Sequence, residues 1–232
     1  MRPIILASGS PRRRELLALS GLAYEVRPAA VLETPLPGEG PAAFATRMSQ
    51  AKARLAADGK ASAAGSAEPG ALVLGADTIV VLDGAIIGKP AGAAQAVEIL
   101  RRLRGRTHQV LTAITVIDTA AEPRAELTNL VTTPVPMRAY SDEEIEAYVA
   151  TGNPLDKAGA YAIQYAGFQP VDLEHFAGCF ANVMGLPVCR LLRLLAARGV
   201  QPSRLHQPPG DCDHFEPGAC PIIPQIVMES AP

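Results

Sequence analysis

The sequence contains no tryptophan, and aromatic residues make up only 4% of its 232 residues. Proteins that bind single-stranded nucleic acid stack the bases on aromatic side chains, so this composition argues against such a surface. The formal net charge is only -2, which gives no reason to expect binding to nucleic acid or to a membrane through bulk charge. A small molecule is therefore the expected partner.

Long apolar runs and a cysteine framework are also missing. No uninterrupted apolar stretch is long enough to cross a bilayer, and no charged leader followed by an apolar segment and a cleavage site is present. The four cysteines are irregularly spaced, unlike those of small disulfide-rich domains. We therefore expect a cytoplasmic protein whose thiols stay reduced.

The length allows one large domain or two small ones with a sizeable core. Periodic patterns continue to about residue 199, and the chain then becomes rich in proline. We predict a domain over residues 1–199 and a tail over residues 200–232. In the tail, Cys212, His214 and Cys220, with His206 nearby, match no standard zinc spacing, so a loosely docked tail is favoured over a metal site.

The N-terminal segment predicts a strand, a loop of small residues and a helix. Residues 4–7 form an apolar run, Ser10 is a candidate N-cap, and the helix is expected from Pro11 to about residue 20. Three arginines, residues 12–14, lie beside this helix N-terminus, where backbone N–H groups and the helix dipole attract anions. The junction predicts a phosphate site, and a capped helix with a solvated arginine face is the alternative.

An almost continuous apolar run over residues 71–82 is interrupted by one acid, Asp77. The run is typical of a strand that is buried on both faces. An ionised carboxylate at such a position is costly unless a cation, a metal or a hydrogen-bond donor compensates it. Because perturbed carboxylates concentrate at active sites, we interpret Asp77 as functional rather than as half of a structural salt bridge.

Other patterns predict the remaining elements. Asp83-Gly84 predicts a hairpin turn, Ser141 opens a helix with a capping box, and Pro134 and Pro136 confine their strand to a sheet edge or a bulge. Residues 56–70, rich in Ala, Gly and Ser, predict a flexible connection. Helices are expected over residues 41–57, 91–104 and from 188 onward, and strands over residues 24–27, 109–117, 127–137 and 161–164.

Several charged residues have two interpretations. Taken alone, Glu33 in a Pro-rich loop and Lys52 on a helix are best explained as solvated residues. Gly88-Lys89-Pro90 is not a P-loop, because a proline stands where a Ser or Thr is required, but the hairpin should carry Lys89 back toward Asp77. Asp156 and Lys157 could pair with each other or contribute to a site.

The order of the motifs over residues 4–195 resembles the Maf family of nucleoside triphosphate pyrophosphatases. The motifs are Ser8-Gly9-Ser10-Pro11-Arg12-Arg13 with Glu15-Leu16-Leu17, Glu33, Lys52-Ala53, Gly75-Ala76-Asp77-Thr78, Gly88-Lys89-Pro90, Asp156-Lys157-Ala158-Gly159 and Gly185-Leu186-Pro187. Each motif is weak alone, and together they are strong.

This resemblance implies an α/β fold with a long mixed twisted sheet flanked by helices, and two lobes around a cleft, as in inosine triphosphate pyrophosphatases. It implies cleavage between the α and β phosphates of a nucleotide with a divalent metal, Mg²⁺ or Mn²⁺, and it assigns Asp77 as the proton acceptor that activates water. It also implies a homodimer and a house-cleaning role in nucleotide metabolism.

Three positions divide the family. The branch that acts on dTTP and UTP has Arg, Thr and Gln where this chain has Arg12, Thr78 and Gln164, whereas the branch that acts on 7-methyl-GTP has Trp, Gln and Glu. A Gln side chain both donates and accepts, which suits the mixed edge of uracil or thymine. The chain departs from the family pattern in residues 56–70, in residues 165–179 and in the tail.

The resemblance and the residues together give one hypothesis. A divalent metal lies near Glu33 and Asp77, where hard oxygen ligands suit such ions. The alternatives are a non-catalytic nucleotide-binding regulator of cell division and a purine-type, inosine or xanthosine, triphosphate pyrophosphatase. The expected substrate-binding residues are Ser8, Arg12, Arg13, Lys52, Thr78, Lys89, Asp156, Lys157 and Gln164.

Overall fold

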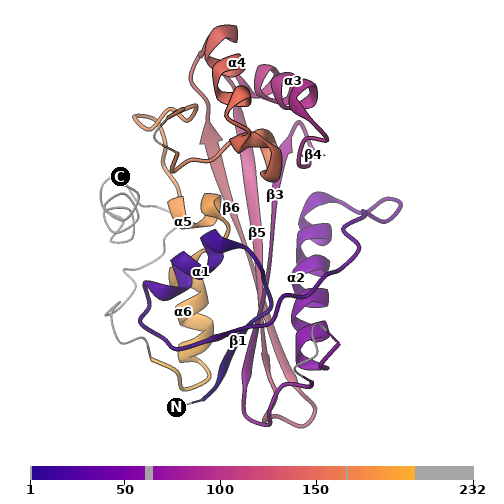
Figure 1. Cartoon of the computed structure of the whole chain (residues 1–232). Coiled ribbons are helices and arrows are strands. Elements are labelled where there is room, and N and C mark those ends of the chain that lie inside the picture. The colour runs from indigo at the N-terminus through magenta and orange to yellow at the C-terminus, as the bar shows by residue number, and fades with distance from the viewer. Residues whose placement is uncertain (1, 61–64, 166, 202–232) are drawn as a thin grey trace. The chain divides into compact units, whose positions relative to one another are not determined.

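The computed structural model describes residues 2–60, 65–165 and 167–201, and these residues form a mixed sheet flanked by helices (Figure 1). The sheet has the strand order β2-β1-β3-β5-β6, and β4 pairs with β3. The strands are β1 (Ile4–Leu6), β2 (Glu25–Val26), β3 (Leu72–Leu82), β4 (Ala85–Ile87), β5 (Thr107–Asp118) and β6 (Ala125–Pro136). The predicted α/β fold is confirmed.

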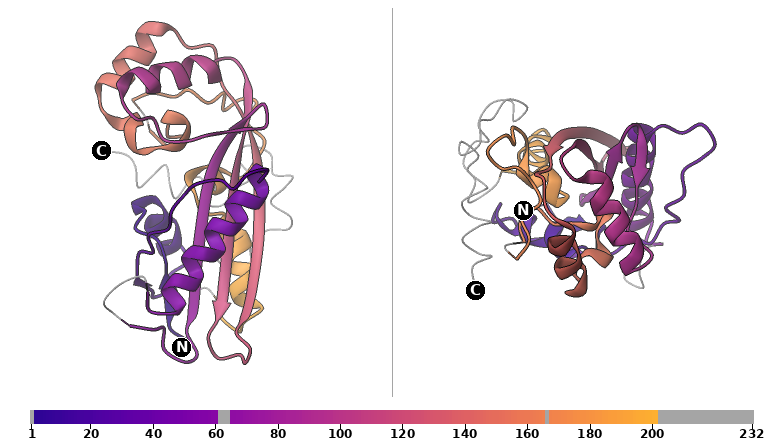
Figure 2. Two further views of the ribbon diagram at one scale, coloured as in Figure 1. Left: turned by 90° about the vertical axis from the view of Figure 1, so that its right-hand side faces the viewer. Right: turned by 90° about the horizontal axis from the view of Figure 1, so that it is seen from above.

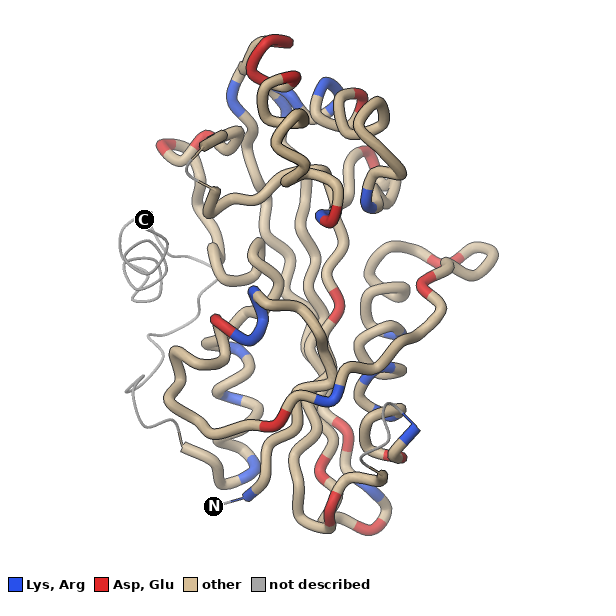
Figure 3. Tube along the Cα trace, in the orientation of Figure 1, with Lys and Arg blue, Asp and Glu red and all other residues tan. Residues whose placement is uncertain are grey.

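Helices precede, connect and follow these strands. The α-helices are α1 (Pro11–Ala18), α2 (Pro41–Ala57), α3 (Ala93–Leu103), α4 (Asp142–Ala150), α5 (Phe180–Met184) and α6 (Val188–Ala196), and the 3-10 turns are η1 (Asn153–Asp156) and η2 (Ala158–Ala160). The described chain divides into two compact units. Unit 1 comprises residues 2–60, 65–77, 112–131 and 185–201, and unit 2 comprises residues 78–111, 132–165 and 167–184. Each unit carries charged residues of both signs (Figure 3).

In unit 1, α2 packs closely on β3 through small residues (Figure 2). Alternate residues of a strand share a face, so Val73, Gly75 and Asp77 form one row. A Cβ on Gly75 would lie 2.2 Å from the carbonyl oxygen of Ser49 and 2.8 Å from the Cβ of Ala53, both in α2. Only glycine permits this approach, which places α2 directly beside the row that ends in Asp77.

The boundaries of α2 follow from its sequence. Pro41 occupies the first turn, where its missing N–H is tolerated, and Phe44 and Met48 lie on the buried face. The predicted range, residues 41–57, is confirmed. In the same unit β1 pairs in parallel with both β2 and β3, with Ile5 opposite Val73.

In unit 2, the turn between β3 and β4 is the predicted hairpin. Asp83 and Gly84 have φ angles of 52° and 76°, the left-handed pair that a two-residue hairpin needs. Pro134 and Pro136 lie in β6, the last strand of the sheet order, so the edge prediction is confirmed. Ser141 forms the predicted capping box with Glu144.

Three expectations differ from the structure or lie outside it. Residues 161–164 form a turn and irregular backbone rather than a strand, because Gly159 and Ala160 both adopt left-handed φ angles just before them. In the connection predicted over residues 56–70, Ala67 is buried and packs in the core of unit 1. The tail from residue 202, with its four candidate metal ligands, lies outside the described residues.

None of the helices in the described residues is long and apolar enough to span a membrane. Cys179 and Cys189 are free thiols.

Candidate active site

Asp77, the acid predicted to need a partner, forms a buried ion pair with Lys52. The Lys52 ammonium nitrogen Nζ lies 2.6 Å from Asp77 Oδ1, and the two residues are only 8% and 6% exposed. A carboxylate at this depth is costly without a cation, so the pair explains how an apolar strand tolerates an acid. The interpretation of Lys52 as a solvated helix lysine is wrong, since α2 directs it onto β3.

Glu33 reaches the same ammonium from the irregular segment between β2 and α2. Lys52 Nζ donates to Glu33 Oε1 at 2.6 Å, although the Glu33 side chain is 52% exposed. Arg47 of α2 tethers this segment by an ion pair with Glu39 and a hydrogen bond to the carbonyl oxygen of Thr34. Bonding to Arg47 lowers the pKa of Glu39 to about 2, so the tether stays charged at ordinary pH. Two carboxylates therefore converge on one lysine.

Arg13 of α1 lies within electrostatic range of this group. Its Nε donates to the carbonyl oxygen of Gly185 at 2.8 Å, and its Nη1 donates to Ser8 Oγ at 3.1 Å. Burial lowers the pKa of Arg13, whereas the nearby Asp77 and Glu33 carboxylates raise it. A guanidinium keeps its charge under such influences, so Arg13 adds a fixed positive charge close to Asp77.

The N-terminus of α1 has the predicted residues but not the predicted cap. Ser10 is the N-cap residue and Pro11 the first helical residue, yet the Ser10 hydroxyl makes no capping bond. The Ser10 N–H instead donates to Ser8 Oγ at 3.3 Å. Arg12 is half-buried, and within the described residues its side chain forms no hydrogen bond or ion pair. The first turn of α1 thus keeps the uncapped form that can bind an anion.

In unit 2, the loops that carry Lys89 and Lys157 are joined through their backbones. The N–H of Gly159 donates to the carbonyl oxygen of Gly88 at 3.2 Å. Val80 pairs with Ile87 in the hairpin, and the same direction brings the exposed Lys89 back toward Thr78. That the hairpin carries Lys89 toward Asp77 stays a prediction, because the paired register ends at Ile87.

Asp156 and Lys157 pair with each other, which is the simpler of the two interpretations. The Lys157 ammonium donates to the Asp156 carboxylate and to the carbonyl oxygen of Asn153. The Lys157 side chain is 13% exposed and that of Asp156 is 77% exposed. Gln164 is half-buried, and no hydrogen bond in the described chain joins it to another predicted site residue. Their roles toward a substrate stay predictions.

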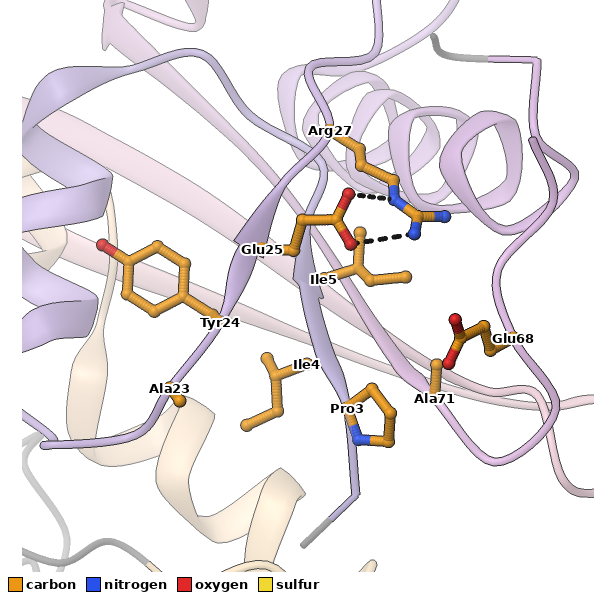
Figure 4. Close-up of a pocket in the computed structure, with 9 residues that line it drawn as sticks. All are labelled: Pro3, Ile4, Ile5, Ala23, Tyr24, Glu25, Arg27, Glu68 and Ala71. Carbon is orange, nitrogen blue, oxygen red and sulfur yellow. Dashed lines mark hydrogen bonds and ion pairs between the residues drawn. The ribbon is translucent and has the colours of Figure 1, made fainter. Parts of the chain in front are cut away.

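One cavity of unit 1 lies apart from these residues. It has a volume of about 260 Å³ and is lined by β1, by the chain around β2, and by Glu68 and Ala71 (Figure 4). Of its three charged side chains, Glu25 and Arg27 pair with each other at 2.7 Å, and the third is Glu68. None of the predicted site residues lines this cavity. This cavity therefore contains none of the groups around Asp77.

Sequence reasoning missed the residues that hold the site groups in place. Gly185 orients Arg13 through its carbonyl oxygen although 172 residues separate the two, and His108 of β5 contacts Tyr161 next to the Lys157 loop. The Gly-Leu-Pro motif pointed to the first of these positions without giving it a role. No sequence signal pointed to the second contact, because 53 residues separate its partners.

The carboxylates at Lys52 fit a divalent cation that is shared with a substrate. Mg²⁺ is commonly held by one or two carboxylates together with substrate phosphates. Glu33 and Asp77 supply two carboxylates that already contact one nitrogen. Among the described residues, no cluster of three or more His, Cys, Asp or Glu side chains could hold a metal alone. The donor set therefore suits Mg²⁺ or Mn²⁺ bound jointly with phosphate oxygens.

Comparison with known proteins gives several close relatives. A dTTP/UTP pyrophosphatase of Geobacter metallireducens is 45% identical over 196 residues, which cover 84% of this chain and 96% of the relative. A dTTP/UTP pyrophosphatase of Anaeromyxobacter dehalogenans is 47% identical over 196 residues, 84% of this chain and 94% of the relative. One from Thermomicrobium roseum is 45% identical and is covered over 84% of its length.

The family model described as Maf-like protein matches residues 3–198. This range contains every motif on which the resemblance was based, from the Ser8 loop to Gly185-Leu186-Pro187. The chain belongs to the Maf-like protein family.

Proposed function

We propose that this protein hydrolyses dTTP and UTP to the nucleoside monophosphate and pyrophosphate. The observation that supports this most directly is the buried Asp77 carboxylate, held by Lys52 at 2.6 Å with Arg13 nearby. A carboxylate fixed among cations suits the activation of water beside a bound anion. The names of the close relatives support the choice of dTTP and UTP.

Each group has a role in this proposal. The water oxygen bonds to the α phosphorus, the bond between that phosphorus and its bridging oxygen breaks, and pyrophosphate leaves. Asp77 takes the proton from the water, while Lys52 donates to its Oδ1 and orients the carboxylate. Ser8, Arg12, Arg13 and the first turn of α1 bind phosphate oxygens, so most of the rate enhancement comes from positioning and charge stabilisation.

Glu33 and Asp77 would hold a Mg²⁺ or Mn²⁺ ion, which when bound neutralises phosphate charge. Lys52 contacts both carboxylates and keeps them together before substrate arrives. Thr78, Lys89, Asp156, Lys157 and Gln164 are proposed as further substrate contacts, with Arg12, Thr78 and Gln164 selecting pyrimidines. A homodimer and a cytoplasmic location stay predictions from the sequence.

Pyrophosphate release from a nucleotide panel with Mg²⁺ or Mn²⁺ tests the proposal. Activity on dTTP and UTP above that on dGTP, ITP and XTP is expected. A purine preference would favour the inosine-type alternative, and no release with any nucleotide would favour a binding protein. Hydrolysis of dTTP in ¹⁸O-water should label dTMP, whereas label in pyrophosphate would place the attack at the β phosphorus.

A further inference from the structure

A buried hydrogen bond in unit 2 lies beside the segment that carries Lys157 and Gln164. His108 Nε2 and the Tyr161 hydroxyl are 2.8 Å apart, and the two residues are 1% and 5% exposed. Their rings meet edge to face, with centroids 5.4 Å apart and an interplanar angle of 82°. The bond joins the start of β5 to the chain just after η2.

The backbone before Tyr161 is strained. Gly159 has a φ of 73° and Ala160 a φ of 58°, and a left-handed alanine is disfavoured by its Cβ. Such conformations persist when the surrounding structure enforces them. Two contacts do so here, the Gly159 N–H bond to the Gly88 carbonyl oxygen and the His108 bond to Tyr161.

Tyr161 therefore anchors a segment that carries two of the predicted substrate-binding residues. Lys157 lies four residues before it and Gln164 three residues after it. A notional Cβ on Gly159 would lie 3.0 Å from Val80 and 3.2 Å from the Tyr161 ring, so the turn is pressed between β3 and this ring. Loss of the anchor would free the strained turn and move both flanking side chains.

We propose that His108 and Tyr161 are positioning residues, whose mutual hydrogen bond holds residues 157–164 in the conformation that binds the nucleotide. This inference rests on the proposed function for the role of Lys157 and Gln164. It adds two residues that touch neither phosphate nor base. Burial lowers the pKa of His108 to about 4, so the ring stays neutral and the bond keeps its form at ordinary pH.

Tyr161→Phe tests the proposal with a matched control. Tyr140, also buried in unit 2, donates its hydroxyl to the carbonyl oxygen of Leu100 at 2.7 Å, so Tyr140→Phe removes a comparable buried bond neither of whose partners lies in residues 157–164. We expect Tyr161→Phe to raise the KM for dTTP about tenfold or more, as misplacement of binding groups does, while kcat changes less. Tyr140→Phe should leave KM unchanged.

The KM values of the single and double variants separate a positioning role from loss of folded protein. Loss of folded protein lowers the apparent kcat but leaves KM unchanged, whereas loss of positioning raises KM. In His108→Leu/Tyr161→Phe, the effect on KM should be no larger than in the single variants, because one shared bond is lost. Equal KM values for Tyr161→Phe and Tyr140→Phe would overturn the proposal.

Hydrogen exchange gives a readout that does not depend on activity. Peptides covering residues 157–165 should exchange faster in Tyr161→Phe than in the wild-type protein, and unchanged exchange there would also overturn the positioning role. If the wild-type protein released no pyrophosphate from dTTP or UTP while this exchange difference was present, the proposed function would fail and the anchoring of the segment would stand.

Discussion

Acid should destabilise the fold through His108. Burial lowers the pKa of this histidine from 6.5 to about 4, so in the folded protein the ring stays neutral in a range where the unfolded chain binds a proton. The unfolded state then holds more protons, and the free energy of unfolding falls as the pH decreases from about 6.5 to about 4. Above that range His108 contributes no pH dependence.

The size of the effect follows from the two pKa values. One pKa unit corresponds to about 1.4 kcal/mol, so the interval from 6.5 to about 4 corresponds to about 3 kcal/mol of unfolding free energy. His108→Gln removes the titrating ring. Between these pH values, unfolding free energy should fall less steeply in the variant than in the wild-type protein, by up to about 1.4 kcal/mol per pH unit.

Urea denaturation followed by far-UV circular dichroism, at pH values from about 7.5 to about 4.5, measures this slope. Thr115→Val is the matched control, because it also removes a buried hydrogen bond from β5 but no ionisable group, and it should leave the slope as in the wild-type protein. Carboxylates that titrate in the same range act equally in all three proteins and cancel in the comparison. Identical slopes for wild type and His108→Gln would refute the reasoning.

Four other substitutions probe the group around Asp77. Gly75→Ala would place a Cβ 2.2 Å from the Ser49 carbonyl oxygen and displace α2. We expect the unfolding free energy to fall by about 1–3 kcal/mol and the activity to decrease. A stable, active variant would contradict the close packing of α2 on β3. Lys52→Met leaves Asp77 buried without its cation and should cost about 3–5 kcal/mol in urea denaturation; Asp77→Asn should cost less, because Lys52 still pairs with Glu33. Glu33→Gln should raise the Mg²⁺ concentration for half-maximal pyrophosphate release by about tenfold or more, and an unchanged Mg²⁺ requirement would exclude Glu33 as a ligand.

Local features of the fold could be predicted from the sequence, because their causes lie within a few residues. Pro41 and the apolar face of α2 define that helix, Asp83-Gly84 defines a hairpin, and Ser141 defines a capping box with Glu144. Each depends on a backbone conformation or a capping hydrogen bond that a few residue types provide and most others do not. The sheet position of β6 followed in the same way from its two prolines.

The partners of the site residues could not be predicted from spacing. Lys52 and Asp77 are 25 residues apart, and only the approach of α2 to Gly75 brings them together. The expected strand over residues 161–164 was wrong because tertiary contacts enforce a left-handed turn at Ala160, which local preference opposes. The sequence predicted that Asp77 needs a cation, a metal or a hydrogen-bond donor, and the structure shows that Lys52 is its partner.

The central claim is that Asp77 activates water for pyrophosphate release from dTTP and UTP. Asp118 is a matched control, since it is also 6% exposed and pairs with Arg2 rather than with a predicted site residue. Initial rates with dTTP should fall at least about a hundredfold in Asp77→Asn, the usual loss when a general base is removed. Asp118→Asn, adjusted for its folded fraction, should keep the wild-type rate. A folded Asp77→Asn protein that releases pyrophosphate at the wild-type rate would contradict the assignment.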